Sequence, residues 1–300
     1  MASMLKSKLD SGRFALTAEV VPPLSADPED LLKIARPLKG LADAVNITDG
    51  ASARAHIDVM VGARLLHDIG VEPILQLTCR DRNRIALQSL LIGAAALDLT
   101  NILVLTGDDP KKGDQPDAKP VFDLDSTALM ATAVSIRDEH QLPHGRKVKG
   151  PIDYFLGVAD SPIDPAPGWA PTGLAKKVAA GAQFAQTQFC MDAGVVRRYL
   201  ARLAEHGLAG KIKFLIGVAP LASAKSASWI RENLFGSIIP DAIVERLEKA
   251  ADPKAEGAKI CIEYIQQLAE IPGVSGAHVM APLNEKAVPE VLTNARKALA

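Results

Sequence analysis

The chain has 300 residues, 48% of them hydrophobic and 23% charged, a composition that predicts a substantial core and excludes a disordered protein. Its 34 Lys and Arg residues nearly balance its 35 Asp and Glu residues, so neither a nucleic-acid partner nor a membrane surface is indicated. No apolar stretch reaches the roughly 18–20 residues of a membrane-spanning helix. The three cysteines are scattered, which is typical of a reduced compartment, and we therefore expect a cytoplasmic protein.

Short apolar runs bounded by turn residues recur along the chain and predict buried strands with helices between them. In chain order the predicted strands cover 14–21, 44–48, 72–77, 102–105, 154–158, 184–189, 212–218 and 276–280. The predicted helices cover about 27–39, 52–68, 82–98, 126–140, 174–181, 193–206, 224–232, 240–250 and 254–270, and a last helix closes the chain. Such alternation indicates a parallel sheet, and at this length it favours a single (β/α)8 TIM barrel, one catalytic domain over residues 1–300.

The stretch Asn101-Ile-Leu-Val-Leu-Thr-Gly-Asp-Asp-Pro110 carries the most informative strand end. Its apolar run leads into Gly107, which permits backbone angles closed to other residues, and then into the carboxylates Asp108 and Asp109. Ligands bind at the carboxyl ends of parallel strands, so both carboxylates are expected at the mouth of the barrel. Two such residues can instead cap a turn, and from this stretch alone the turn is the better interpretation.

The other strand ends bring carboxylates, hydroxyls and amides to the same mouth: Glu19, Thr48 with Asp49, Gln76 with Thr78, Gln186 with Gln188, and Asn284. No spacing of His and Cys residues resembles a zinc site. His278 lies inside a predicted strand and is interpreted as a core residue with a partner, and Cys79 as a small buried hydrophobe. Isolated carboxylates with amides suit acid catalysis and cation stabilisation on a polar heterocycle, and a Gln complements the amide edge of a pterin.

Six motifs follow one another along the chain: Ala18-Glu-Val-Val-Pro-Pro23, Asn46-Ile-Thr-Asp-Gly50, Gln76-Leu-Thr-Cys79, Leu105-Thr-Gly-Asp-Asp-Pro110, Lys177-Val-Ala-Ala-Gly-Ala182 with Thr187-Gln-Phe189, and Gly217-Val-Ala-Pro220. In order and spacing this set resembles the methylenetetrahydrofolate reductase family, flavin-dependent barrel enzymes that make 5-methyltetrahydrofolate. Any one motif is weak, but together they carry the resemblance from end to end of the chain.

The resemblance implies roles for individual residues. Glu19 resembles the general acid that protonates the bridging nitrogen of the folate, so that its methylene group opens to a reactive iminium ion. Asp108 resembles the carboxylate that stabilises this cation, and Gln188 resembles the amide that holds the pterin. Four residues fall at flavin-contacting positions: Thr48, Gly107, Asp108 and Lys177.

Other expected cofactor positions depart from the family pattern. Gln76 stands where a His is common, and Thr106 stands where an Arg is common. Phe155 and Ala159 replace a Tyr-x-x-x-His near the end of the fifth strand, and the aromatic residue common past Pro220 is absent, with Ala224 near its place. These departures leave three alternatives open: FAD held differently, FMN in its place, or no flavin at all.

By resemblance, the expected reaction is reduction of 5,10-methylenetetrahydrofolate to 5-methyltetrahydrofolate, with NADH or NADPH as donor and FAD as carrier. This belongs to one-carbon metabolism and methionine biosynthesis, and it could run oxidatively in one-carbon catabolism. Tetrahydrofolate derivatives are the expected ligands, and a homo-oligomer is expected. Two alternatives remain open, a barrel that moves a methyl group between tetrahydrofolate and a corrinoid partner, and a non-catalytic folate-binding subunit.

Overall fold

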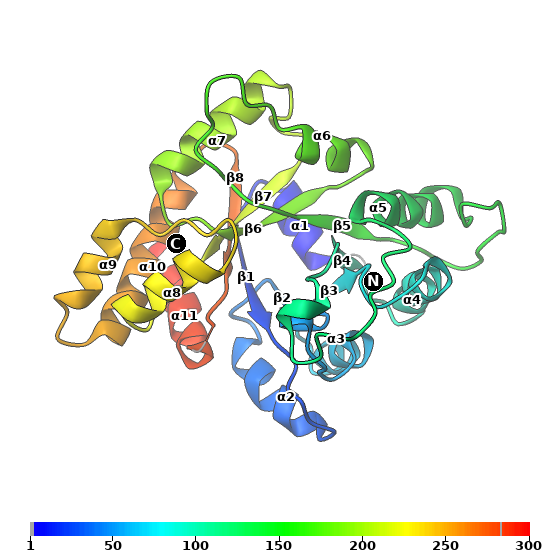
Figure 1. Cartoon of the computed structure of the whole chain (residues 1–300), viewed down its shortest axis with the longest axis horizontal. Helices are drawn as coiled ribbons and strands as arrows, with labels where there is room; N and C mark the ends of the chain where they lie inside the picture. Colours follow the sequence, from blue (N-terminus) through cyan, green and yellow to red (C-terminus); the bar gives the residue numbers. More distant parts are fainter. Residues whose placement is uncertain (1–2, 283) are drawn as a thin grey trace.

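The computed structural model describes residues 3–282 and 284–300, in which parallel strands close into a barrel in the order of the sequence (Figure 1). The strands are β1 (Ala15–Val20), β2 (Ala44–Ile47), β3 (Pro73–Thr78), β4 (Asn101–Leu105), β5 (Phe155–Asp160), β6 (Phe184–Phe189), β7 (Lys213–Val218) and β8 (Val274–Val279). Because β8 pairs with β1, the sheet has no free edge. Helices alternate with these strands, and the predicted (β/α)8 TIM barrel is confirmed.

Helices form the outer layer around the barrel (Figure 1). They are α1 (Met4–Asp10), α2 (Pro28–Ala35), α3 (Val59–Asp68), α4 (Arg84–Ala96), α5 (Ser126–Val134), α6 (Thr172–Ala179), α7 (Ala193–Glu205), α8 (Ala224–Asn233), α9 (Asp241–Glu248), α10 (Pro253–Ala269) and α11 (Val288–Ala298). The start of α2 is as predicted, because the Asp27 carboxylate accepts the backbone N–H of Glu29 at 2.9 Å. Within the described ranges, no helix is long and apolar enough to cross a membrane.

The helix predicted from residue 52 begins later than expected. Ser52 and Ala53 have φ angles of 55° and 54°, a left-handed conformation that a right-handed helix cannot contain. The Asp58 carboxylate instead accepts the backbone N–H of Met60 at 2.9 Å and so fixes the start of α3 at Val59. The residues before Asp58 therefore remain a loop at the carboxyl end of β2.

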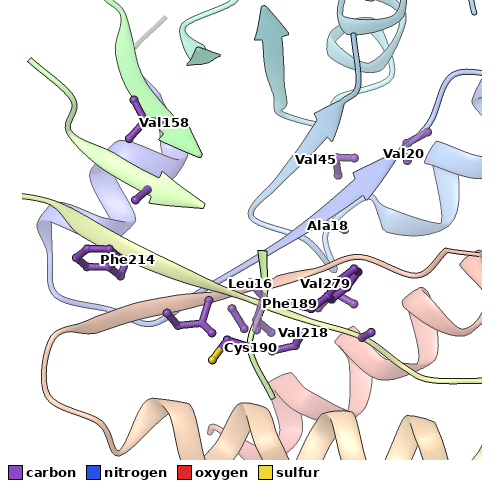
Figure 2. Close-up of a cluster of buried hydrophobic side chains, with 14 of the residues drawn as sticks. Leu16, Ala18, Val20, Val45, Val158, Phe189, Cys190, Phe214, Val218 and Val279 are labelled. Carbon is purple, nitrogen blue, oxygen red and sulfur yellow. The ribbon is translucent and has the colours of Figure 1, made fainter. Parts of the chain in front are cut away.

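Side chains alternate along each strand between the helix layer and the barrel interior. Leu16, Ala18 and Val20 of β1 face outward and join Val218 and Val279 in the buried cluster of Figure 2. The inward side chains nearest the amino ends of the strands form a separate apolar cluster: Ala15, Ala44, Ile74, Leu103, Phe155, Phe184 and Leu215. The same alternation places Glu19 of β1 on the inner side, nearer the carboxyl end.

Helix α1, which the sequence did not predict, closes the amino end of the barrel. Leu5 and Leu9 are buried against the inner apolar cluster. Phe155 and Phe184 stack within it, with ring centroids 4.7 Å apart. Burial of a side chain of this size contributes about 1.5–3 kcal/mol. The inner apolar cluster together with Leu5 and Leu9, which we call the apolar floor, is therefore a stable part of the core.

Above the floor lies a polar layer, which we define as Thr17, Asn46, Gln186 and His278. Asn46 Nδ2 donates to Gln186 Oε1 at 2.6 Å, and Gln186 Nε2 donates to Asn46 Oδ1 at 2.9 Å. Thr17 Oγ1 lies 2.9 Å from His278 Nδ1. Buried polar groups are costly unless they are hydrogen-bonded, and these four buried side chains satisfy one another.

Candidate active site at the barrel mouth

Glu19 lies directly above the polar layer. Its side chain is 23% exposed, and its Oε2 accepts a hydrogen bond from Gln76 Nε2 at 3.2 Å. The same oxygen lies 3.9 Å from His278 Nε2. No described residue forms a hydrogen bond with the other oxygen, Oε1. The carboxyl group is therefore fixed on one side and available to a ligand on the other, as a general acid requires.

His278 is buried beneath Glu19, and its prediction as a core residue with a partner is confirmed. Gln186 Nε2, which can only donate, lies 3.2 Å from His278 Nδ1. This arrangement makes Nδ1 an acceptor, so in the neutral ring the hydrogen lies on Nε2, which faces Glu19. The sequence did not indicate this relationship, because it depends on the pairing of Thr17 with His278 between β1 and β8.

Asp108 and Asp109 have different surroundings. The Asp109 carboxylate accepts the backbone N–H of Lys111 at 2.9 Å and caps a short 3-10 helix, as the turn interpretation expected. Asp108 is exposed and forms no hydrogen bond with any residue that the structure describes. Gly107 has a φ of 94°, and a Cβ there would lie 3.0 Å from the Cβ atoms of Thr78 and Arg80. Only glycine fits this close approach, which holds Asp108 at the rim above β3 and β4.

Asp49 has a structural role, because its carboxylate joins two neighbouring strand ends through hydrogen bonds. Its Oδ2 accepts hydrogen bonds from Thr78 N and Thr78 Oγ1, both at 2.9 Å, and from Arg82 Nη1 at 2.6 Å. Asp49 and Thr78 are thus occupied in joining the ends of β2 and β3. Thr48 differs, because its hydroxyl oxygen is buried and has no hydrogen-bond partner among the described residues. A buried hydroxyl of this kind calls for a partner, and a bound ligand would supply one.

A cavity of about 330 Å³ lies over the loops that follow β2, β3 and β4, with Arg54, His56, Arg80, Arg82 and Gln115 among its lining residues. His56 Nδ1 is buried there without a partner in the described part of the chain. The pKa of Arg80 is raised, chiefly by its hydrogen bond with Asp81, with smaller contributions from Asp49 and Asp108. A larger hollow, about 620 Å³, lies by α9 and α10 away from the strand ends, where Arg246 is already paired with Glu256 and Glu263.

Gln188 lies near the end of β6, and Lys177 lies on α6 with its side chain reaching the end of β5. A register shift between Gln186 and Phe189 marks a bulge at the end of β6, and such bulges commonly re-aim side chains near active sites. Gln188 Oε1 accepts the backbone N–H of Phe189 at 3.0 Å, and no described residue partners its Nε2. Lys177 Nζ donates to the carbonyl oxygen of Ala159 at 2.6 Å, which holds its charge beside the end of β5.

Three residues that the sequence placed at the mouth either lie elsewhere or form hydrogen bonds with neighbouring residues. Phe155 is the first residue of β5 and lies in the apolar floor, about 13 Å below Ala159 at the usual rise along a strand. The structure therefore does not bring Phe155 to the mouth. Thr106 is exposed, and its Oγ1 donates to Ser126 Oγ at 3.3 Å. Asn284 Nδ2 donates to the carbonyl oxygen of Pro220 at 2.8 Å.

Asp160 is the last residue of β5, although the sequence predicted that this strand ends at Val158 and did not single Asp160 out. Its Oδ2 accepts the Tyr199 hydroxyl at 2.6 Å, which ties β5 to α7. Burial raises the pKa of Asp160, and the hydrogen bond from Tyr199 partly opposes that rise. Cys79 is fully buried and burial raises its pKa to about 11, in agreement with its interpretation as a small hydrophobe. Across the described ranges, no cluster of three His, Cys, Asp or Glu side chains could hold a metal ion.

The family pattern described as methylenetetrahydrofolate reductase matches residues 4–296, nearly the whole chain. The chain belongs to the methylenetetrahydrofolate reductase family. A probable methylenetetrahydrofolate reductase (NADPH) of Caenorhabditis elegans is 26% identical over 301 residues, which cover 95% of this chain and 42% of that relative. This member of the family thus spans less than half the length of the nematode protein.

Solved structures of low sequence identity share the barrel fold of this chain. An uncharacterized protein from Clostridium thermocellum that binds two copies of 5-methyl-5,6,7,8-tetrahydrofolic acid has a TM-score of 0.69 at 15% identity, covering 98% of this chain and 99% of that one. Riboflavin lyase with modified FMN and riboflavin has a TM-score of 0.58 at 10% identity, covering 95% of this chain and 91% of that one. At these identities the likeness establishes the fold alone.

Proposed function

We propose that this protein reduces 5,10-methylenetetrahydrofolate to 5-methyltetrahydrofolate with electrons from NADH or NADPH. The observation that supports the proposal most is the setting of Glu19 in a member of this family. One carboxylate oxygen is held by Gln76 at 3.2 Å, and the other faces the mouth without a partner among the described residues. A general acid needs this combination of fixed orientation and access.

The three proposed substrate residues have separate tasks. Glu19 donates its proton to the bridging nitrogen of the folate, and the methylene group opens to an iminium ion. Asp108, which is exposed and not engaged by a described side chain, stabilises the developing positive charge. Gln188 offers its unpartnered Nε2 to the edge of the pterin and orients the ring between the two carboxylates.

We propose a flavin, FAD in the first instance, as the hydride carrier between NAD(P)H and the folate. The unpartnered Thr48 hydroxyl would accept or donate a hydrogen bond to a polar ligand. The cavity over the loops after β2, β3 and β4 is lined by three arginines and three aspartates, a polar lining that also suits such a ligand. Thr48, Gln76, Thr106, Gly107, Asp108 and Lys177 are the residues that would hold it. Phe155 is left out because it lies in the apolar floor. We expect weaker flavin retention than the family norm, since Gln76 and Thr106 replace a His and an Arg.

An absorption spectrum of the purified protein, followed by anaerobic titration with NADH and then NADPH, tests the proposal. We expect a flavin spectrum, at least after addition of free FAD or FMN, that is bleached by one donor and restored by methylenetetrahydrofolate. Turnover with no bound flavin would contradict the proposed flavin carrier but would leave the proposed reductase activity standing. Folate binding without turnover would favour a folate-binding subunit, and transfer of the methyl group to a corrinoid would favour the methyltransferase.

Three further properties are proposed with the reaction. We propose that one barrel domain carries the whole activity, that the protein forms a homo-oligomer, and that it acts in the cytoplasm. Sedimentation of the purified protein gives its mass in solution, and a monomer at working concentration would contradict the second property. Comparing initial rates in both directions decides whether the enzyme works reductively or oxidatively.

A further inference from the structure

A tight turn beside β6 exposes an aromatic ring. Phe235 is 90% exposed, the highest value of any large hydrophobic side chain in the described part of the chain. Ser237 N donates to Leu234 O at 3.1 Å and closes the turn, and Gly236 adopts a φ of 80° at its third position. A turn of this kind requires a glycine at that position, and it places Phe235 at the projecting corner.

The turn is anchored to the barrel. Ile238 N donates to Phe189 O at 2.8 Å, and Met191 N donates to Ile238 O at 2.8 Å. These bonds form a parallel bridge between Ile238 and Cys190, directly beyond the end of β6. The backbone of the turn is thus held by the strand that carries Gln188, so the position of the aromatic ring relative to that amide is limited.

The turn also borders the proposed pterin site. A Cβ at Gly236 would lie 2.9 Å from Ser161 Oγ and 3.9 Å from Gln188 Cγ, so the backbone passes closely over both side chains. The hydroxyl oxygen of Ser237 is buried here and finds no partner among the residues described. Phe235 is therefore next to a glycine whose backbone passes close to the aliphatic part of the Gln188 side chain.

We propose that Phe235 is a substrate-positioning residue whose ring covers the flat heterocycle of a folate held by Gln188. A phenylalanine is usually buried, and a ring exposed at a fixed place beside a ligand site has apolar area that a planar ligand can cover. Aromatic rings stack on conjugated heterocycles in an offset arrangement, which adds orientation to the affinity. The inference rests on the proposed folate chemistry and adds a residue that fixes how the pterin lies.

Binding of 5-methyltetrahydrofolate to three variants tests this role without requiring turnover. We expect Phe235→Ala to raise the dissociation constant by about 10-fold, the order expected for a lost stacking contact. Phe235→Trp should keep the affinity, and its added indole fluorescence should be quenched when the folate binds. Val61→Ala, which truncates an exposed side chain on α3, is the matched control and should bind as the wild type.

Each outcome decides a separate question. Unchanged affinity in Phe235→Ala, or an equal loss in Val61→Ala, overturns the role of Phe235. Folate binding by the wild type without reduction overturns the proposed reaction but leaves the role of Phe235 standing if the variants behave as expected. No binding of 5-methyltetrahydrofolate by the wild type at millimolar concentration overturns both.

Discussion

Glu19 faces His278 across the boundary between the polar layer and the barrel mouth, with carboxylate Oε2 3.9 Å from imidazole Nε2. The distance exceeds that of a hydrogen bond, and the ring is held in place from below by Thr17 and Gln186. A fixed ring at this position leaves Glu19 little freedom to turn inward. The carboxyl group therefore presents its free oxygen to the mouth.

Glu19→Gln separates acid catalysis from cofactor binding within a single variant. The amide keeps the shape of the side chain but has no transferable proton, so reduction of methylenetetrahydrofolate should fall by roughly 10²–10⁴-fold. With a hydride carrier bound, oxidation of NAD(P)H by a quinone should persist, and stopped-flow absorbance follows both half-reactions. If both fall together, Glu19 holds the cofactor, and if neither falls, it is not the acid.

Asp108→Asn and Asp109→Asn form a matched pair of adjacent substitutions. Asp108→Asn removes the charge proposed to stabilise the cation, so folate reduction should fall by about 10²-fold or more. Asp108 forms no hydrogen bond with a described residue, so the melting temperature should stay within a degree or two of the wild type. Asp109→Asn should keep both activity and stability, because Asn also caps helices well. Wild-type turnover in a well-folded Asp108→Asn protein would refute the assignment.

The strands were predictable because apolar runs and the turn residues that bound them are local signals. Glu19, Asp108 and Gln188 could be placed at the mouth for the same reason, since each lies close to the carboxyl end of such a run. The interior arrangement could not be predicted in this way. That Asp49 is saturated by Thr78 depends on how neighbouring strands pair, and helix α1 was missed because its amino-acid pattern is too short to be distinctive.

The two glutamines of β6 should differ in what their loss affects. Gln186→Leu would remove both side-chain hydrogen bonds of Asn46, while His278 would keep its contact with Thr17. The cost is about 1–3 kcal/mol in the free energy of unfolding for each orphaned group of Asn46. Gln188→Leu should change that free energy by only about 0.5 kcal/mol but weaken folate binding. Urea denaturation and folate titration measure the two effects, and an equal loss of stability in both variants would contradict the distinction.

Asp43 predicts a pH-dependent part of the stability. Burial alone would raise the pKa of Asp43, but hydrogen bonds from Leu16 N, Lys8 and Arg296 lower it below its usual value. A carboxyl group with a lowered folded-state pKa stabilises the protein above its unfolded-state pKa of about 4, and this contribution is lost as the pH falls through the folded-state pKa.

Asp43→Asn should therefore lower the free energy of unfolding at pH 7 by about 1–3 kcal/mol, since its partners lose a buried charge. The difference from wild type should shrink as the pH falls below about 4. Asp10→Asn breaks an exposed pair with Lys6 and should have an effect of about 0.5 kcal/mol or less at any pH. A deficit for Asp43→Asn that is the same at pH 3 and pH 7 would count against this account.

The polar layer also limits which substitutions the chain can accept at these four positions. Thr17, Asn46, Gln186 and His278 come from four strands, and the first and last are 261 positions apart in the chain. Replacing any one of them removes a hydrogen bond from at least one of the others, so we expect single substitutions in this layer to lower stability. We expect these four positions to change together among descendants of a common ancestor, even where the surrounding helices have diverged freely.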